Sequence, residues 1–94
     1  KMHFLIRAKA LVAFPGGFGT LDELFETLTL LQTGKTQSVI VVLVGRDFWE
    51  RLINWQFLID CGLIAQADLG LFHYAETAQE AWDLISRHNG VPTT

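Results

Sequence analysis

The stretch ALVAFPGGFGTLDE, residues 10–23, decides the fold. Its first part, Ala10–Phe14, is a short apolar run that stops at a Pro-Gly-Gly sequence, as expected for a buried strand that enters a turn. The residues after the turn, Thr20–Thr33, place leucine and phenylalanine at helical spacing, and Gly34 follows as a helix stop. The stretch therefore predicts a strand, a glycine turn and a helix.

The rest of the chain continues this alternation. Two further strands are predicted, Ser38–Val44 and Leu71–Tyr74. Two further helices are predicted, Phe48–Asp60 and Ala78–His88. Residues 1–9 are mostly non-β-branched and predict the end of a helix, while Leu63–Gly70 is compatible with a short helical turn. Strands alternating with helices favour an α/β fold, a Rossmann-like three-layer αβα arrangement with a parallel sheet and right-handed crossovers.

Length and composition indicate one domain over residues 1–90 and a tail at 91–94. The chain begins at Lys1 without an initiator methionine, and three strands make a small sheet. We therefore expect a fragment, the C-terminal portion of the fold, which further chain or a partner completes.

The balance of residue types excludes several function classes. Of 94 residues half are apolar, and a net charge of −3 without a basic run predicts no nucleic-acid partner. Cys61 is the only cysteine, and the three histidines are scattered, so we expect neither a disulfide nor a metal site. The sequence shows no signal peptide and no apolar run of membrane-spanning length, which predicts a cytoplasmic protein without a membrane partner.

The glycine turn suits an anion. Glycines let the backbone approach a ligand closely, and the first N–H groups of the following helix attract phosphate or carboxylate. Thr20 can add a hydroxyl donor. The dinucleotide-binding fingerprint is rejected because it needs Gly or Ala where Asp22 stands. The P-loop pattern, which Gly34-Lys35-Thr36 would end, is rejected because it needs a glycine where Thr29 stands. The alternative is a tight connection without a ligand.

Glu23 has two competing interpretations. Thr20–Glu23 matches a capping box, in which the glutamate side chain returns to the start of its helix. Asp47–Glu50 and Thr77–Glu80 have the same spacing at the starts of the other two predicted helices. By local rules alone, Glu23 is therefore a helix cap rather than a catalytic group.

The stretch PGGFGTLDE, residues 15–23, resembles the P-G-G-x-G-T-x-x-E motif of the Lonely Guy (LOG) family, many of whose members carry the label "possible lysine decarboxylase". The family's upstream R-K-x-x-M motif places its lysine fourteen residues before the motif proline, where Lys1 stands. The following LFETLTLLQTGK resembles the bacterial branch of the family. The motif arginine would precede Lys1, and Phe4 replaces the motif methionine.

The resemblance implies a Rossmann-like homodimer that hydrolyses the N-glycosidic bond of a nucleoside 5′-monophosphate, without a cofactor, and releases base and ribose 5-phosphate. It implies Glu23 as the catalytic carboxylate and these substrate or phosphate contacts: Gly16, Gly17, Phe18, Gly19, Thr20, Lys1 and Thr29. No lysine has a context that marks a Schiff base, so decarboxylation is discounted. The alternatives are a non-catalytic carrier of a nucleotide or phosphate cofactor and, third, a dimerisation unit built on the apolar helix Leu21–Leu31.

Overall fold

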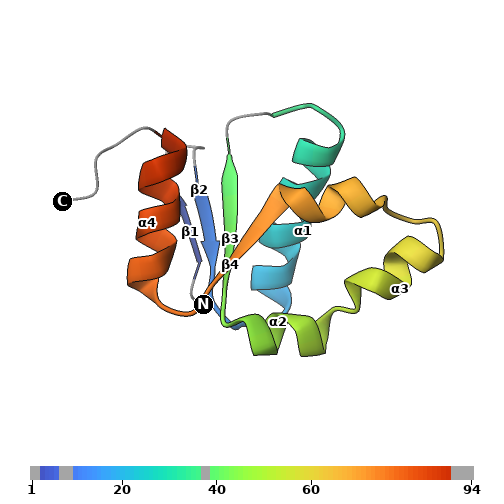
Figure 1. Ribbon diagram of the computed structural model, residues 1–94, viewed down its shortest axis with the longest axis horizontal. Coiled ribbons are helices and arrows are strands. Elements are labelled where there is room, and N and C mark those ends of the chain that lie inside the picture. Colours follow the sequence, from blue (N-terminus) through green and yellow to red (C-terminus); the bar gives the residue numbers. More distant parts are fainter. Residues whose placement is uncertain (1–2, 7–9, 37–38, 90–94) are drawn as a thin grey trace.

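The computed structural model describes residues 3–6, 10–36 and 39–89. These residues form a four-stranded sheet in the order β1-β2-β3-β4, with helices on both faces (Figure 1). The strands are β1 His3–Ile6, β2 Ala10–Ala13, β3 Ile40–Val44 and β4 Phe72–Ala75. The helices are α1 Phe18–Gln32, α2 Arg46–Leu52, α3 Trp55–Asp60, the 3₁₀ helix η1 Gln66–Leu71 and α4 Ala78–Asn89.

Strands β2, β3 and β4 pair in parallel, as predicted. Val12 lies opposite Val42, and Leu43 opposite Tyr74. Parallel neighbours need a crossover connection, which α1 supplies between β2 and β3. The α/β prediction is confirmed, and the carboxyl ends of the three parallel strands lie at one edge of the sheet.

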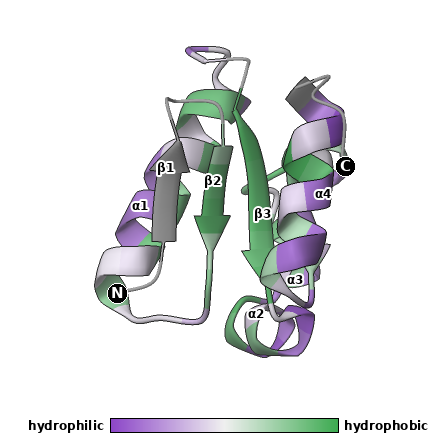
Figure 2. Cartoon of the chain, turned by 90° about the vertical axis from the view of Figure 1, so that its left-hand side faces the viewer, coloured by the Kyte–Doolittle hydropathy of each residue, from purple (hydrophilic) through white to green (hydrophobic). Residues whose placement is uncertain are grey.

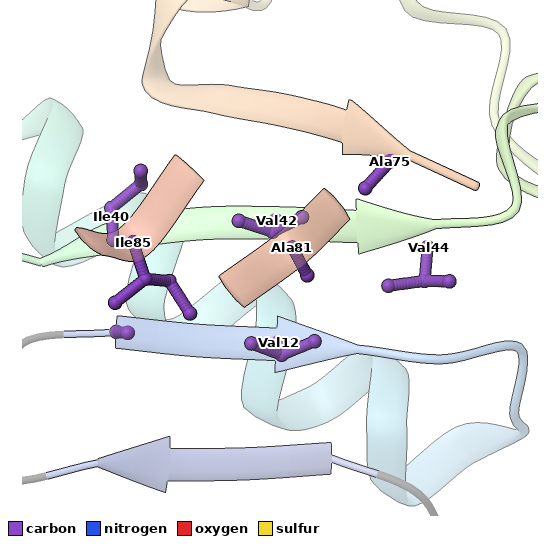
Figure 3. Close-up of a cluster of buried hydrophobic side chains, with 8 residues drawn as sticks. Val12, Ile40, Val42, Val44, Ala75, Ala81 and Ile85 are labelled. Atoms are coloured by element: carbon purple, nitrogen blue, oxygen red, sulfur yellow. The ribbon is translucent and has the colours of Figure 1, made fainter. Parts of the chain in front are cut away.

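The core has two halves because the central strand β3 is buried on both faces. On one face, β2, β3 and β4 pack against α4 through the residues that Figure 3 labels: Val12, Ile40, Val42, Val44, Ala75, Ala81 and Ile85. On the other face, Leu11, Val41 and Leu43 pack against Leu24 of α1 and Trp49 of α2. Figure 2 shows hydrophobic residues along β2 and β3 and hydrophilic residues over much of α4. The continuous apolar run of β3 thus follows from its burial on two sides.

The helix predicted for residues 1–9 is wrong within the described residues. His3–Ile6 is strand β1, which pairs antiparallel with β2, so that Phe4 lies opposite Val12. The physical reason is pairing: without β1, the described sheet would end at β2 and leave one side of its backbone unpaired. A segment of four residues is also too short for a stable helix.

The single helix predicted for Phe48–Asp60 is two helices. Ile53 is extended, with φ −124° and ψ 121°, and ends α2. Asn54 then begins α3, because its side chain accepts a hydrogen bond of 2.9 Å from the Phe57 N–H. An N-cap asparagine that competes for the backbone starts a new helix. The predicted turn at Leu63–Gly70 is in part the 3₁₀ helix η1, which starts at Gln66.

None of the helices in the described residues is long and apolar enough to cross a membrane.

Replacement of Ser86 by alanine should leave stability unchanged or raise it by about 1 kcal/mol. The Ser86 side chain on α4 is buried, and its hydroxyl has no hydrogen-bond partner among the described residues. Removing an unpaired buried hydroxyl relieves a desolvation cost. Thermal unfolding of the full-length protein measures the effect.

Thr77→Ala is the control of opposite sign, because Thr77 Oγ1 accepts a hydrogen bond of 3.1 Å from the Glu80 N–H at the start of α4. Loss of this cap should cost about 1 kcal/mol. A clear loss of stability in Ser86→Ala would show that its hydroxyl is satisfied.

Candidate functional site

The loops after β2, β3 and β4 meet at the carboxyl edge of the sheet. A Cβ on Gly45, which follows β3, would lie 3.5 Å from Pro15 Cγ in the loop after β2. The Gly45 N–H donates a 2.8 Å hydrogen bond to the carbonyl of Ala75, at the end of β4. The next N–H, that of Arg46, donates to Glu76 Oε2 at 3.1 Å. In open α/β sheets this edge is where ligands bind.

The glycine turn leads directly into α1. Gly17 is the N-cap of this helix, and no side chain caps it. The Leu21 N–H donates to the Gly17 carbonyl at 3.0 Å. By helix geometry, the N–H groups of Phe18, Gly19 and Thr20 therefore precede the first intrahelical donor and point out of the helix start. Phe18 is 92% exposed.

Thr20 is packed under the turn. It is the third helical residue and only 2% exposed. A Cβ built on Gly16 would collide with Thr20 Oγ1 and lie 3.0 Å from its Cβ. Gly16 therefore has to be glycine for the Thr20 hydroxyl to reach this position. The turn thus places the Thr20 hydroxyl against the backbone of Gly16, just before the start of α1.

Glu23 is not positioned to close a capping box with Thr20. The helix begins at Phe18 and has no acidic residue in its first turn, so Glu23 is its sixth residue. The local-rule prediction is wrong here, because glycine itself serves as the N-cap. Glu23 is half-buried, and its carbonyl accepts a 2.9 Å hydrogen bond from Thr27 Oγ1.

The same rule fails for α2 and succeeds for α4. Gly45 is the N-cap of α2, and Glu50 pairs with Arg46 at 3.0 Å instead of returning to Asp47. At α4, the Thr77 hydroxyl caps the Glu80 N–H as predicted, while the Glu80 carboxylate accepts from the Glu76 N–H, one residue before the predicted partner. In α1 and α2 a glycine, Gly17 or Gly45, is the N-cap, so each helix begins earlier than it would with the predicted N-cap, Thr20 or Asp47.

One predicted site residue of the described chain, Thr29, is not brought beside Glu23. Thr29 is six residues beyond Glu23 on α1, which at 100° per residue places it about 120° around the helix. It is exposed, and its hydroxyl donates to the Phe25 carbonyl at 2.7 Å. The prediction for Lys1 lies outside the described residues. The described cluster is therefore Gly16, Gly17, Phe18, Gly19, Thr20 and Glu23.

Sequence reasoning missed the contribution of the β3 loop. Gly45 adjoins the turn at Pro15, and Arg46 begins α2 with its guanidinium carbon 4.9 Å from the centre of the Tyr74 ring. A signal was available in the sequence: Gly45 directly follows a strand that is parallel to the one before the turn. Because β2 and β3 are parallel, the residues that follow them lie at the same edge of the sheet.

Among the described residues, ionisable groups with shifted pKa values lie on η1 and β4. Burial raises the pKa of the Tyr74 hydroxyl, although the hydrogen bond from Trp55 Nε1 opposes this. Hydrogen bonds from the Ala65 N–H and from Gln32 lower the pKa of the Asp68 carboxyl. No group of three metal-binding side chains occurs within residues 3–6, 10–36 and 39–89.

Comparison with known proteins identifies the family of the chain. A family model described as "possible lysine decarboxylase" matches residues 1–85. The chain therefore belongs to this family, which is the LOG family of the motif resemblance.

Three curated relatives carry cytokinin-related names. A rice (Oryza sativa subsp. japonica) protein named probable cytokinin riboside 5′-monophosphate phosphoribohydrolase LOGL3 is 29% identical over 89 residues, 94% of this chain and 42% of that protein. The rice protein named cytokinin riboside 5′-monophosphate phosphoribohydrolase LOG is 32% identical over 74 residues, 78% of this chain and 31% of its own. A bifunctional cytokinin biosynthesis protein of Fusarium pseudograminearum is 35% identical over 69 residues, 72% of this chain and 14% of its own. The chain spans less than half the length of each.

Gly16→Ala should destabilise the protein by about 1–3 kcal/mol, because its methyl group would occupy the position of Thr20 Oγ1. Gly17→Ala is the matched control, since a Cβ at Gly17 would meet nothing within 4 Å. Its cost should be smaller, limited to the difference between glycine and alanine at an N-cap. Urea unfolding of the full-length variants compares them, and equal costs would show that Thr20 gives way freely.

The pKa of Asp68 should lie below its ordinary value and move toward that value in Gln32→Ala, which removes the 2.8 Å hydrogen bond from Gln32 Nε2. A depressed carboxyl pKa contributes stability above the unfolded pKa, and this contribution is lost as pH falls through the folded pKa. Gln32→Ala should therefore lower stability at neutral pH, and this loss should disappear at pH values below the folded pKa of Asp68, where the carboxyl is protonated in both proteins.

NMR titration of the Asp68 carboxyl carbon measures the shift. Gln56→Ala is the control, because Gln56 bonds to Asp60 within α3 at 2.9 Å and not to Asp68. An unchanged Asp68 titration in Gln32→Ala would contradict the assignment.

Proposed function

We propose that the protein hydrolyses the N-glycosidic bond of a nucleoside 5′-monophosphate, either AMP or a cytokinin riboside 5′-monophosphate, to the free base and ribose 5-phosphate. One observation carries the proposal: the motif of residues 15–23 forms a glycine turn and helix start at the carboxyl edge of the sheet, and Glu23 follows it without serving as the cap of α1. The names of the rice relatives supply the substrate class.

The glycine turn is suited to the 5′-phosphate. Three outward N–H groups, at Phe18, Gly19 and Thr20, and the dipole of a 15-residue helix favour an anion. Thr20 adds its hydroxyl under Gly16. Backbone donors of this kind hold a phosphate without a basic side chain, which agrees with the acidic chain.

Glu23 is suited to the reacting carbon. Gly17 and Glu23 are six residues apart, about 9 Å along the helix axis. Side chains of a helix tilt toward its N-terminus, which brings the carboxylate closer to the turn than its Cα. A ribose bound by its 5′-phosphate at the turn would therefore direct C1′ toward Glu23.

The chemistry requires charge stabilisation and water. The bond between C1′ and the base nitrogen breaks, and its electron pair leaves with the base. The sugar acquires oxocarbenium character, which the Glu23 carboxylate stabilises. The oxygen of a water molecule bonds to C1′. One water proton stays on the new C1′ hydroxyl, and the other is transferred to the base nitrogen, directly or by way of the Glu23 carboxylate. Phosphate binding positions the reacting carbon and so contributes to the rate.

Glu23→Gln should lower the rate of base release from AMP, or from a cytokinin riboside 5′-monophosphate, on the order of 10²–10⁴-fold. The glutamine keeps the size of the side chain and removes its charge. Base release from the full-length protein is measured by chromatography, and calorimetry measures nucleotide binding in the same variant, which should persist.

Glu26→Gln is the matched control, because Glu26 is an exposed carboxylate one helical turn further along α1. Its rate should stay within a few-fold of the wild type. Equal losses of the rate of base release in Glu23→Gln and Glu26→Gln would show that Glu23 is not the catalytic carboxylate. Tight nucleotide binding with the ligand recovered intact from the wild type would instead support the carrier function.

We also propose the homodimer implied by the family. The described face of α1 exposes several apolar side chains, Phe18, Phe25 and Leu30, which a partner subunit can cover. These side chains lie on the same helix as the turn and Glu23. A partner on this face would therefore adjoin the proposed site.

A further inference from the structure

A cavity of about 140 Å³ lies between α1, α3, η1 and β4. The helices α1 and α3 are on the side of the sheet opposite α4 (Figure 1). Apolar side chains from all four elements line most of the cavity: Phe25, Leu28, Trp55, Leu58, Leu71 and Phe72. An engineered cavity of about 150 Å³ with similar walls, in another protein, binds benzene. The cavity therefore has room for one six-membered ring or a branched group of similar size.

The walls of the cavity are held by contacts between the elements that form them. Trp55 Nε1 donates a hydrogen bond of 3.0 Å to the Tyr74 hydroxyl, and the ring centres of Trp55 and Phe72 are 4.5 Å apart. On the other side, Gln32 Nε2 of α1 donates to Asp68 Oδ2 of η1 at 2.8 Å. These contacts hold α3 against β4 and α1 against η1, so the cavity is preformed, as small-molecule sites usually are.

A carboxylate stands at the solvent side of this apolar cavity. Asp68 and Gln32 both line it, and the hydrogen bond between them is exposed. Asp68 Oδ2 also accepts from the Ala65 N–H at 2.9 Å. The bonds from Ala65 and from Gln32 lower the pKa of the Asp68 carboxyl, so this group is ionised at neutral pH. Among the described residues, no cationic side chain pairs with Asp68, and its second oxygen, Oδ1, accepts no hydrogen bond.

We propose that this cavity binds a small organic amine, whose compact aromatic or branched apolar group fills the cavity and whose ammonium group meets the Asp68 carboxylate. The apolar walls favour the hydrocarbon part of the ligand. The carboxylate favours a cation, because a neutral ligand leaves it without a counter-charge and an anion is repelled by it.

The inference does not depend on the proposed function. At 100° per residue, Phe25, Leu28 and Gln32 lie about 140–200° around the axis of α1 from Glu23. The cavity is therefore on another side of this helix from the proposed catalytic carboxylate. None of the measurements that follow requires base release.

The first test compares three ligands that share one ring: benzylamine, benzyl alcohol and benzoate. NMR titration of the full-length protein follows the indole N–H signal of Trp55, whose side chain lines the cavity. Benzylamine should shift this signal saturably and bind about threefold to tenfold more tightly than benzyl alcohol, because a charge-assisted contact is stronger than a neutral one. Benzoate should bind more weakly than either. An unmoved Trp55 signal, or binding of benzyl alcohol or benzoate as tight as that of benzylamine, would overturn the proposal.

Asp68→Asn tests the carboxylate. Asparagine keeps an oxygen that can accept from Gln32 and from the Ala65 N–H, but it removes the charge. The preference for benzylamine over benzyl alcohol should fall below about twofold, while benzyl alcohol should bind as it does to the wild type. Asp60→Asn is the matched control, because it removes the same charge from α3, where Asp60 bonds to Gln56 outside the cavity. Equal loss of the preference in both variants would show that it comes from net charge and not from Asp68.

Leu58→Phe tests the location of the ligand. The larger side chain should take up part of the cavity and weaken benzylamine binding by about tenfold or more. Leu63→Phe makes the same change at a residue that is 69% exposed and outside the cavity, and it should change the affinity by less than about twofold. Binding of wild-type strength in a folded Leu58→Phe protein would overturn the proposal. Should Leu58→Phe fail to fold, the comparison of Asp68→Asn with Asp60→Asn decides alone.

Discussion

The burial of β3 on both faces is the constraint on which the rest of the structure depends. A strand without a solvent-facing side requires a helix layer above and below it, and α1, α2 and α4 supply these layers. Two of these helices, α1 and α2, lie in the crossovers between parallel strands, so the chain returns to the same edge before β3 and before β4. The loops after β2, β3 and β4 are consequently gathered at the opposite edge, where Pro15, Gly45 and Ala75 meet.

This gathering explains how an acidic chain can offer an anion site. With a net charge of −3, the molecule as a whole does not attract phosphate. The turn compensates locally, because its donors are backbone N–H groups whose partial charges are fixed by the start of α1. Such donors act only if they point to one place. The steric fit of Gly16 over Thr20 provides that direction without adding a charged side chain.

The sequence was sufficient for the features that depend on residue periodicity. Hydrophobic runs located β2, β3 and β4, and the spacing of leucines located α1. It was insufficient where one residue competes with its neighbours for the backbone. Asn54 divides one predicted helix because its side chain takes the N–H of Phe57, and the apolar pattern on either side contains no sign of that break. Residues 3–6 form β1 because of an unpaired neighbour in space, which periodicity within four residues cannot reveal.

For the site, the motif located the glycine turn, but the local rule misplaced the start of its helix by treating Thr20 as the cap. The difference has a chemical consequence. With Thr20 as N-cap, Glu23 would be the third helical residue, and its carboxylate would return to the backbone. With Gly17 as N-cap, Thr20 moves inside the helix and under Gly16, and Glu23 belongs to the second turn. A glycine N-cap has no side chain of its own to take the first N–H groups, which is the condition under which a ligand can take them.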